Sequence, residues 1–169
     1  MRPATLLVVD GTNVIWAWPK SRPYMLRQEF ARAQTVLHAA ILESRLMALH
    51  REVVLVFDGP PSPGGPTSAR GTLVLHPNVG KSADDRILEL IAHRGKSGGI
   101  ALVTSDRALR DAARALGATT MGALELLRLL EPGRPNPQAT PQPHGAASEK
   151  PSPSSRDTEA WLKRFNARS

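Results

Sequence analysis

Short apolar runs and longer amphipathic segments alternate along most of the chain. Continuous apolar runs are typical of buried strands and predict five of them, at residues 5–9, 53–57, 72–76, 100–104 and 118–121. Helical spacing of apolar positions predicts helices at residues 25–50, 83–94, 106–116 and 123–130. Gly117 follows the third of these, where left-handed backbone commonly ends a helix. The alternation predicts an α/β fold with a mostly parallel sheet covered by helices.

The pattern ends near Glu131, where the composition changes. Residues 132–153 (PGRPNPQATPQPHGAASEKPSP) hold seven of the 15 prolines and too few apolar residues to bury a core. We therefore predict a domain at residues 1–131, a disordered Pro-rich linker at 132–153 and a short amphipathic C-terminal helix at 154–169. In that helix, Ser154 and Asp157 have capping-box spacing, and Trp161, Leu162 and Phe165 share one face. A helix this short needs a docking surface, either on its own domain or on a protein partner.

Composition and charge narrow the function classes. The 169 residues include no cysteine, which excludes a disulfide scaffold, a zinc ribbon and a cysteine nucleophile. No apolar run approaches the roughly 20 residues of a membrane span, and the first four residues lead directly into the predicted strand at residues 5–9. We therefore expect a cytoplasmic protein without a membrane partner. Lys and Arg (22) outnumber Asp and Glu (15), giving a net charge of +7. That balance favours an anionic partner, of which nucleic acid is the commonest.

Against this basic background, five aspartates are predicted to gather at one edge of the sheet. They follow predicted strands or begin predicted helices: Asp10, Asp58, Asp84, Asp85 and Asp106. In a parallel sheet, strand ends and helix starts share the edge where ligands bind. Singly, each acid has a structural explanation, as a turn residue or a complement to a helix dipole, and Ser82 with Asp85 has capping-box spacing. Together they repel one another, and a hard divalent cation, Mg²⁺ or Mn²⁺, is the simplest compensation.

The same acids lie in motifs that resemble a known family. Residues 9–15 (VDGTNVI) are similar to the first motif of NYN-domain proteins of the YacP type, within the PIN-like nuclease superfamily. The further matching segments follow in the family's order, at residues 16–19 (WAWP), 56–58 (VFD), 82–87 (SADDRI) and 103–106 (VTSD). The resemblance covers nearly all of residues 4–131 and implies a three-layer α/β/α fold with metal-dependent ribonuclease activity. Asp85 departs from the pattern, because relatives often have glutamate there.

The resemblance also implies roles for individual residues. Asp10, Asp84 and Asp106 would be catalytic and would hold the metal, with Asp58 and Asp85 as further candidate ligands. Asn13 would orient a metal water or the scissile phosphate, unless it is an ordinary helix-start residue. Thr104 and Ser105 would hydrogen-bond a metal water or RNA, with helix capping as the alternative for Ser105. A metal-activated water would leave 5′-phosphate and 3′-hydroxyl ends.

Cations are needed beside an acidic edge if RNA is to reach it. The candidates are Lys81, Arg86 and Arg107 next to the acidic motifs and Arg70 in the Gly/Pro-rich loop at residues 58–71. The alternative is that these side chains only keep the domain soluble. Trp16 is a candidate for stacking on a base, although we expect at least one of Trp16 and Trp18 to pack over the sheet edge.

Three functions compete for this sequence. The first is a metal-dependent endoribonuclease acting in RNA processing or translation-linked mRNA decay, on RNA that is free or presented by the ribosome. The second is a non-catalytic module on the same fold that binds RNA or a ribonucleoprotein. The third, a phosphatase of the haloacid-dehalogenase kind, requires a second aspartate two residues after Asp10, and Thr12 stands there.

Overall fold

The computed structural model describes residues 4–95 and 99–131. These residues build a five-stranded sheet in which every pair of neighbouring strands is parallel. The strands are β1 (Leu6–Asp10), β2 (Glu52–Val56), β3 (Thr72–Leu75), β4 (Ile100–Val103) and β5 (Thr119–Met121), in the order β3-β2-β1-β4-β5. All five predicted strands are present, with ends shifted by no more than one residue. The predicted linker and C-terminal helix lie outside the described residues.

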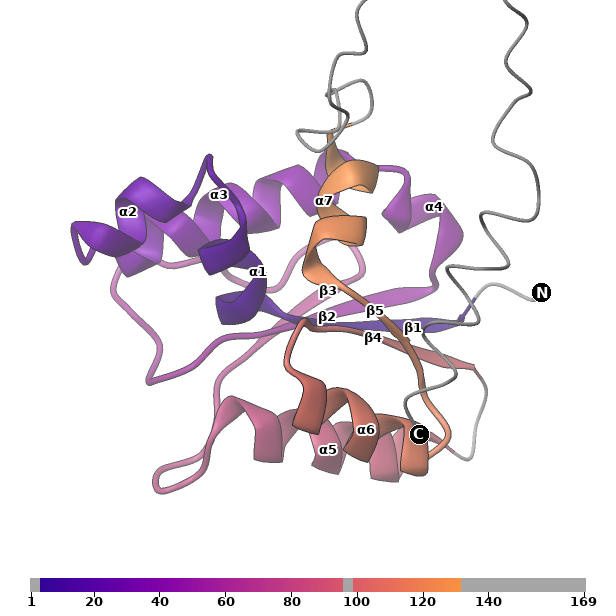
Figure 1. Ribbon diagram of the computed structural model, residues 1–169. Coiled ribbons are helices and arrows are strands. Elements are labelled where there is room, and N and C mark those ends of the chain that lie inside the picture. The colour runs from indigo at the N-terminus through magenta and orange to yellow at the C-terminus, as the bar shows by residue number, and fades with distance from the viewer. Residues whose placement is uncertain (1–3, 96–98, 132–169) are drawn as a thin grey trace, which may run out of the picture. The chain divides into compact units, whose positions relative to one another are not determined.

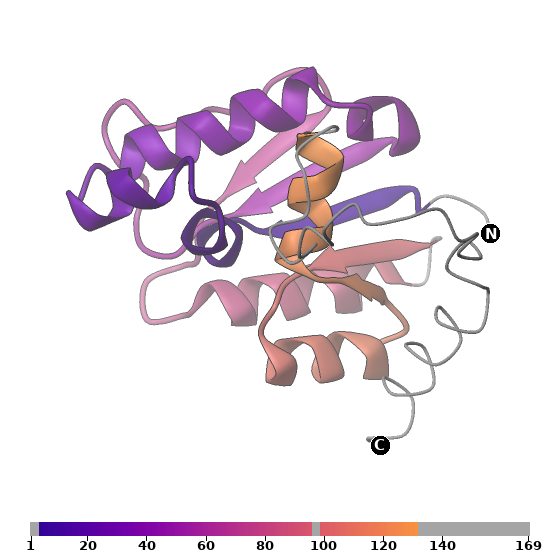
Figure 2. The same ribbon diagram turned by 45° about the horizontal axis from the view of Figure 1, so that its top comes forward.

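Helices cover both faces of this sheet, as Figures 1 and 2 show. One face carries α1 (Gly11–Ala17), α2 (Arg22–Leu26), α3 (Phe30–Glu43), α4 (Leu46–Leu49) and α7 (Ala123–Leu130), and the other carries α5 (Ala83–Arg94) and α6 (Arg107–Ala115). Side chains alternate along the central strand β1, so that Leu7 and Val9 enter one hydrophobic core and Leu6 and Val8 the other. The predicted three-layer α/β/α fold is confirmed. Gly117 has the expected left-handed backbone, with φ 90°.

The single helix predicted over residues 25–50 is wrong in its extent. The structure divides that region among α2, α3 and α4. Gln28 interrupts the helical backbone between α2 and α3 because its own backbone is left-handed, with φ 59°. Ser44 ends α3 in extended backbone, and its hydroxyl donates to the Ile41 carbonyl at 2.7 Å. Apolar spacing continued across both breaks, which is why periodicity alone merged three helices into one.

Helix α1 was not predicted, and it begins directly after the last residue of β1. Asp10 caps this helix by accepting a hydrogen bond from the backbone N–H of Asn13 at 3.3 Å. Gly11 is required at the first position, because a Cβ there would lie 2.4 Å from the ring of Phe57. This close approach brings the start of α1 against the end of β2.

In the ranges 4–95 and 99–131, no helix has the length and apolar character needed to cross a membrane.

Candidate active site at the carboxyl edge of the sheet

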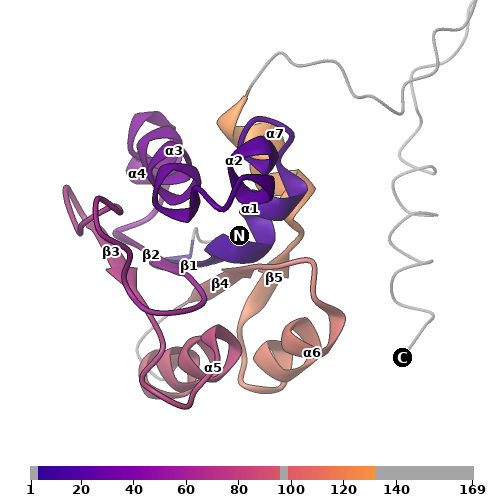
Figure 3. The same ribbon diagram turned by 90° about the vertical axis from the view of Figure 1, so that its left-hand side faces the viewer.

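Because all strands are parallel, their carboxyl ends meet at one edge, and α1, α5 and α6 begin there (Figure 3). Four of the predicted acids belong to this edge. Asp10 is the last residue of β1, Asp58 follows β2, Asp84 lies in the first turn of α5 and Asp106 caps α6. We call Asp10, Asp58, Asp84 and Asp106 the acidic edge.

Asp10 is the most buried member of the acidic edge. Its Oδ2 accepts a hydrogen bond from the Thr104 hydroxyl at 2.9 Å, and its Oδ1 accepts from the N–H of Asn13. Burial, and to a smaller extent the charges of Asp84 and Asp58, raise the pKa of Asp10 to about 6, against the opposing effect of the two hydrogen bonds. The ionised form of Asp10 therefore lowers the free energy of unfolding.

The other acids also affect Asp84. Partial burial raises its pKa, and so do the charges of Asp106, Asp58 and Asp85. Among the described residues, no Lys or Arg contributes to the pKa shift of either Asp10 or Asp84. The acidic edge therefore holds negative charge that its own cations do not offset.

A hydrogen-bonded frame joins β1 and β4 beneath these acids. The Thr104 hydroxyl, while donating to Asp10, accepts from the N–H of Asp106 at 3.1 Å. The side-chain oxygen of Asn13 accepts from the N–H of Ser105 at 2.9 Å. Asn13, predicted as catalytic, thus ties the first motif to the last through its Oδ1. Arg110, which sequence reasoning missed, donates from Nη2 to the Thr104 carbonyl at 3.2 Å.

Ser105 and Thr12 have structural partners as well. The Ser105 hydroxyl accepts from the N–H of Ala123 at 3.1 Å, at the start of α7, whereas the helix that follows Ser105, α6, is capped by Asp106. Thr12 was missed as a site residue, and its hydroxyl accepts from the N–H of Asp58 at 2.9 Å. Its position inside the first motif was the available signal, whereas Arg110 lies in an arginine-rich helix that gave none.

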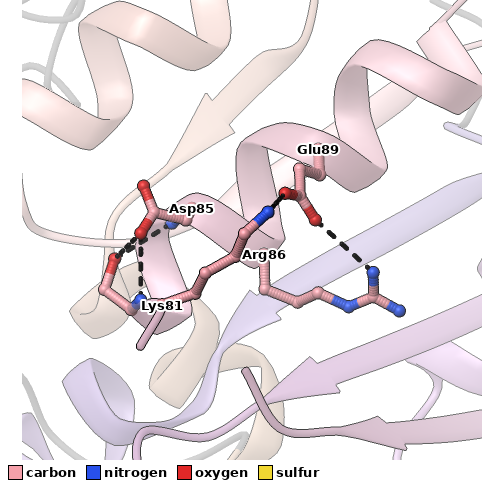
Figure 4. Close-up of polar contacts among 5 residues, drawn as sticks. Lys81, Asp85, Arg86 and Glu89 are labelled. Carbon is pink, nitrogen blue, oxygen red and sulfur yellow. Dashed lines mark hydrogen bonds and ion pairs between the residues drawn. The ribbon is translucent and has the colours of Figure 1, made fainter. Parts of the chain in front are cut away.

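Asp58 and Asp85 both contact the start of α5, with different consequences. The Oδ1 of Asp58 accepts from the N–H of Ala83 at 3.2 Å and keeps Asp58 within the acidic edge. Asp85 forms a capping box, in which its Oδ2 accepts from both the N–H and the hydroxyl of Ser82 at 2.9 Å (Figure 4). These hydrogen bonds lower the pKa of Asp85. The contacts of Asp85 match the structural alternative rather than those of a metal ligand.

The predicted RNA-binding cations differ in availability. Lys81 and Arg86 both pair with Glu89, Arg86 through Nη1 at 3.6 Å (Figure 4). Arg107 is more available than Lys81 and Arg86, with a 77% exposed side chain and a long 3.9 Å contact to Asp111. Arg70 is exposed in its loop, with left-handed φ 51°.

The two tryptophans after the first motif have separate environments. Trp18 is 1% exposed in the hydrophobic core that includes Val14 and Ile15 of α1, and its Nε1 donates to Glu131 Oε1 at 3.3 Å. One tryptophan of the pair is therefore buried. Trp16 is 43% exposed on α1. A base can therefore reach Trp16 but not Trp18.

The donors of the acidic edge suit a hard divalent cation. They are carboxylate oxygens, and a cation would relieve the repulsion that raises the pKa values of Asp10 and Asp84. In the part of the chain that the structure describes, no three His, Asp or Glu side chains are grouped as a ready metal site. Mg²⁺ does not need such a group, because it keeps several waters and uses one or two carboxylates.

Comparison with known proteins supports a ribonuclease-type α/β/α domain. Residues 7–162 match the YacP-like NYN domain, and the chain belongs to that family. The match continues past Glu131 into the segment predicted as linker and terminal helix.

Two solved structures of Rae1 (YacP) from Bacillus subtilis are similar to this chain. One is 26% identical, with a TM-score of 0.64, and covers 96% of this chain and 82% of its own. The other, a point mutant, is 28% identical, with a TM-score of 0.62, and covers 74% of this chain and 73% of its own. A search of curated proteins finds no match.

Proposed function

We propose that this protein is a metal-dependent endoribonuclease that hydrolyses RNA phosphodiester bonds at the acidic edge. The observation that carries the proposal is the gathering of Asp10, Asp58, Asp84 and Asp106 at the carboxyl edge of the sheet, where burial, and then the charges of Asp84 and Asp58, raise the pKa of Asp10 to about 6. Among the described residues, no Lys or Arg lowers the pKa of Asp10 or Asp84. Membership of the YacP-like NYN family supports the choice of RNA as substrate. RNA processing or mRNA decay, on free or ribosome-presented RNA, is the role that we propose.

Asp10, Asp84 and Asp106 would hold Mg²⁺ or Mn²⁺ directly or through water, with Asp58 beside them. A bound divalent ion supplies an acidified water and stabilises charge at the scissile phosphate, which would leave 5′-phosphate and 3′-hydroxyl ends. The Thr104 hydroxyl lowers the pKa of Asp10 and so keeps this carboxylate ionised near neutral pH. Asn13 and Thr104 hold the first and last motifs at a fixed separation.

Cleavage of end-labelled single-stranded and structured RNAs, with Mg²⁺, Mn²⁺ or EDTA, tests the proposal. Asp10→Asn and Asp84→Asn should lose metal-dependent cleavage and keep RNA binding. Asp111→Asn is the control, because Asp111 lies mid-helix in α6 against Arg107 and Arg114 and outside the acidic edge. Metal-independent RNA binding without cleavage by the wild type would overturn the proposal in favour of the non-catalytic binding module.

A further inference from the structure

A second charged surface lies beside the acidic edge and has the opposite sign. Between residues 11 and 42 the chain carries four Lys or Arg and one acid, Glu29. Four members of the surface come from the segment before α2, from α2 itself and from the turn after it, and one from the first turns of α3. We call this surface the basic corner and define it as Lys20, Arg22, Tyr24, Arg27 and Arg32.

The basic corner is on the side of the molecule where the strands end. Figure 1 shows α2 projecting beyond the sheet on that side, and Figure 3, seen from there, shows α2 and the start of α3 beside α1. The hydroxyl of Ser21 fixes this placement, because it is buried and donates to the carbonyl of Ile15 in α1 at 2.9 Å. An RNA strand that extends from the acidic edge across α1 would therefore reach the basic corner.

Two guanidinium groups flank one aromatic ring in this corner. The guanidinium carbons of Arg27 and Arg32 lie 5.5 Å and 4.8 Å from the centre of the Tyr24 ring. Glu29 holds both arginines, at 3.3 Å from Arg27 and 3.4 Å from Arg32. The left-handed backbone of Gln28 makes the turn that brings Arg27 back toward α3.

This arrangement leaves the arginines available. Their side chains are 60% and 65% exposed although both are oriented. One carboxylate serves two arginines here, and Lys20 and Arg22 add charge; Lys20 lies 5.5 Å from the centre of the Trp18 ring. Lys81 and Arg86 likewise share one carboxylate, that of Glu89, but their side chains are less exposed, at 47% and 33%.

We propose that the basic corner binds the single-stranded RNA tract adjoining the cleavage site. The inference rests on the proposed ribonuclease function, since it names where the rest of that substrate runs. Guanidinium groups bind phosphates by paired hydrogen bonds, and aromatic or guanidinium faces stack on unpaired bases. The acidic edge repels a phosphate backbone, so a cationic surface next to it is needed to hold the strand.

The test compares RNA binding by the full chain in EDTA, using single-stranded oligonucleotides of about 4 and about 16 nucleotides. Arg27→Ala/Arg32→Ala should weaken binding of the longer RNA and reduce the slope of log affinity against log salt by about 1.4, since each phosphate contact contributes about 0.7. Binding of the shorter RNA should change less. Tyr24→Leu should weaken binding about fivefold or more, and Tyr24→Phe should restore it.

Arg51→Ala/Arg94→Ala is the matched control. It removes the same charge at the opposite edge, where Arg51 precedes β2 and Arg94 ends α5 against Glu52. Arg27→Lys/Arg32→Lys keeps the charge and should restore the salt slope but not the full affinity, because lysine lacks the planar fork. Circular dichroism of each variant checks that the domain folds.

The outcomes separate this inference from the proposed function. Wild-type cleavage with RNA affinity unchanged in the Arg27/Arg32 variant, relative to the control, would overturn the basic corner alone. Unchanged RNA affinity with weakened binding of polyglutamate would assign the corner to an acidic protein partner and also overturn the inference. Failure of the wild type to cleave any RNA, with binding still lost in the Arg27/Arg32 variant, would overturn the nuclease and keep the corner.

Discussion

Asp84 and Asp85 are consecutive residues at the start of the same helix, and their surroundings shift their pKa values in opposite directions. Partial burial and three neighbouring aspartates raise the pKa of Asp84. Hydrogen bonds from Ser82 lower the pKa of Asp85, and the nearby charge of Lys81 lowers it as well. The two pKa shifts differ in direction because Asp84 lies near Asp106 and Asp58, whereas Asp85 accepts hydrogen bonds from Ser82.

The comparison extends to the groups around the two residues. Asp84 belongs to the acidic edge, where the charges of neighbouring aspartates raise its pKa. Asp85 belongs to what we call the α5 polar network, formed by Lys81, Asp85, Arg86 and Glu89, where opposite charges and hydrogen bonds balance (Figure 4). Two neighbouring acids in the sequence therefore differ in their electrostatic surroundings. The negative charge of Asp84 is destabilised by other aspartates, whereas that of Asp85 is stabilised by hydrogen bonds from Ser82.

The largest expected effect separates the two neighbours. Asp84→Asn should lower metal-dependent RNA cleavage by more than about 100-fold, the cost of losing one preorganised charge-stabilising group. Asp85→Asn should leave most cleavage intact and lower the midpoint of thermal unfolding, because it weakens the capping box. Cleavage assays and thermal melts of both variants check this. Equal loss of cleavage in both would remove the distinction.

Asp10 should show the strain of the acidic edge as a pH-dependent stability. Its folded pKa of about 6 exceeds the ordinary value of 3.8, so the folded state binds more protons between these values and the free energy of unfolding falls as pH rises through that window. Above it the cost is about 3 kcal/mol. Asp10→Asn should therefore raise stability at pH 7 by up to that amount and little at pH 3.

Chemical denaturation of wild type and Asp10→Asn at several pH values measures this difference. Added Mg²⁺ should stabilise the wild type more than the variant, because binding to the folded state adds to its stability. A difference between the two proteins that stays constant from pH 3 to pH 7 would show that Asp10 ionises normally.

Thr104 should affect cleavage through Asp10. In the wild type, the hydrogen bond from the Thr104 hydroxyl lowers the pKa of Asp10. Thr104→Val removes this hydroxyl, so the pKa of Asp10 should rise and the acidic limb of the pH profile of cleavage should move to higher pH. We expect a loss of about 10- to 100-fold, as for other groups that orient metal ligands. Thr104→Ser should restore both rate and profile. A uniform loss without a pH shift would indicate a packing defect instead.

Much of this fold was predictable because its strands are continuous apolar runs. The runs at residues 5–9 and 53–57 correspond to β1 and β2, and their parallel pairing puts Asp10 and Asp58 at one edge. Helix boundaries were not predictable in the same way. The helix break at Gln28 has a left-handed backbone, although the residue is not glycine. The start of α1 lies so close to the ring of Phe57 that only glycine fits at position 11, and the sequence does not reveal this contact.

The candidate site was predicted by residue type but not by contact. Sequence position made Asp84 a primary candidate ligand, Asp85 a further candidate and Asn13 a candidate with a helix-start alternative. The hydrogen bonds of Asp85 to Ser82 and of Asn13 to Ser105 are contacts that the sequence did not predict. The pairing of Lys81 with Glu89, eight residues apart, exceeds the three- or four-residue spacing from which helical ion pairs are predicted. Roles assigned to these residues remain predictions that the variants above test.

The smallest expected effect concerns the α5 polar network. Glu89→Gln removes the charge that both Lys81 and Arg86 pair with, so these cations become available to phosphate. RNA affinity should rise by no more than about fivefold, because surface ion pairs are weak, and the gain should diminish at high salt. Binding titrations at low and high salt measure it, with Glu125→Gln in the first turn of α7 as the control. An equal gain in both variants would reflect net charge alone, whereas a gain confined to Glu89→Gln would show that the network withholds cations from RNA.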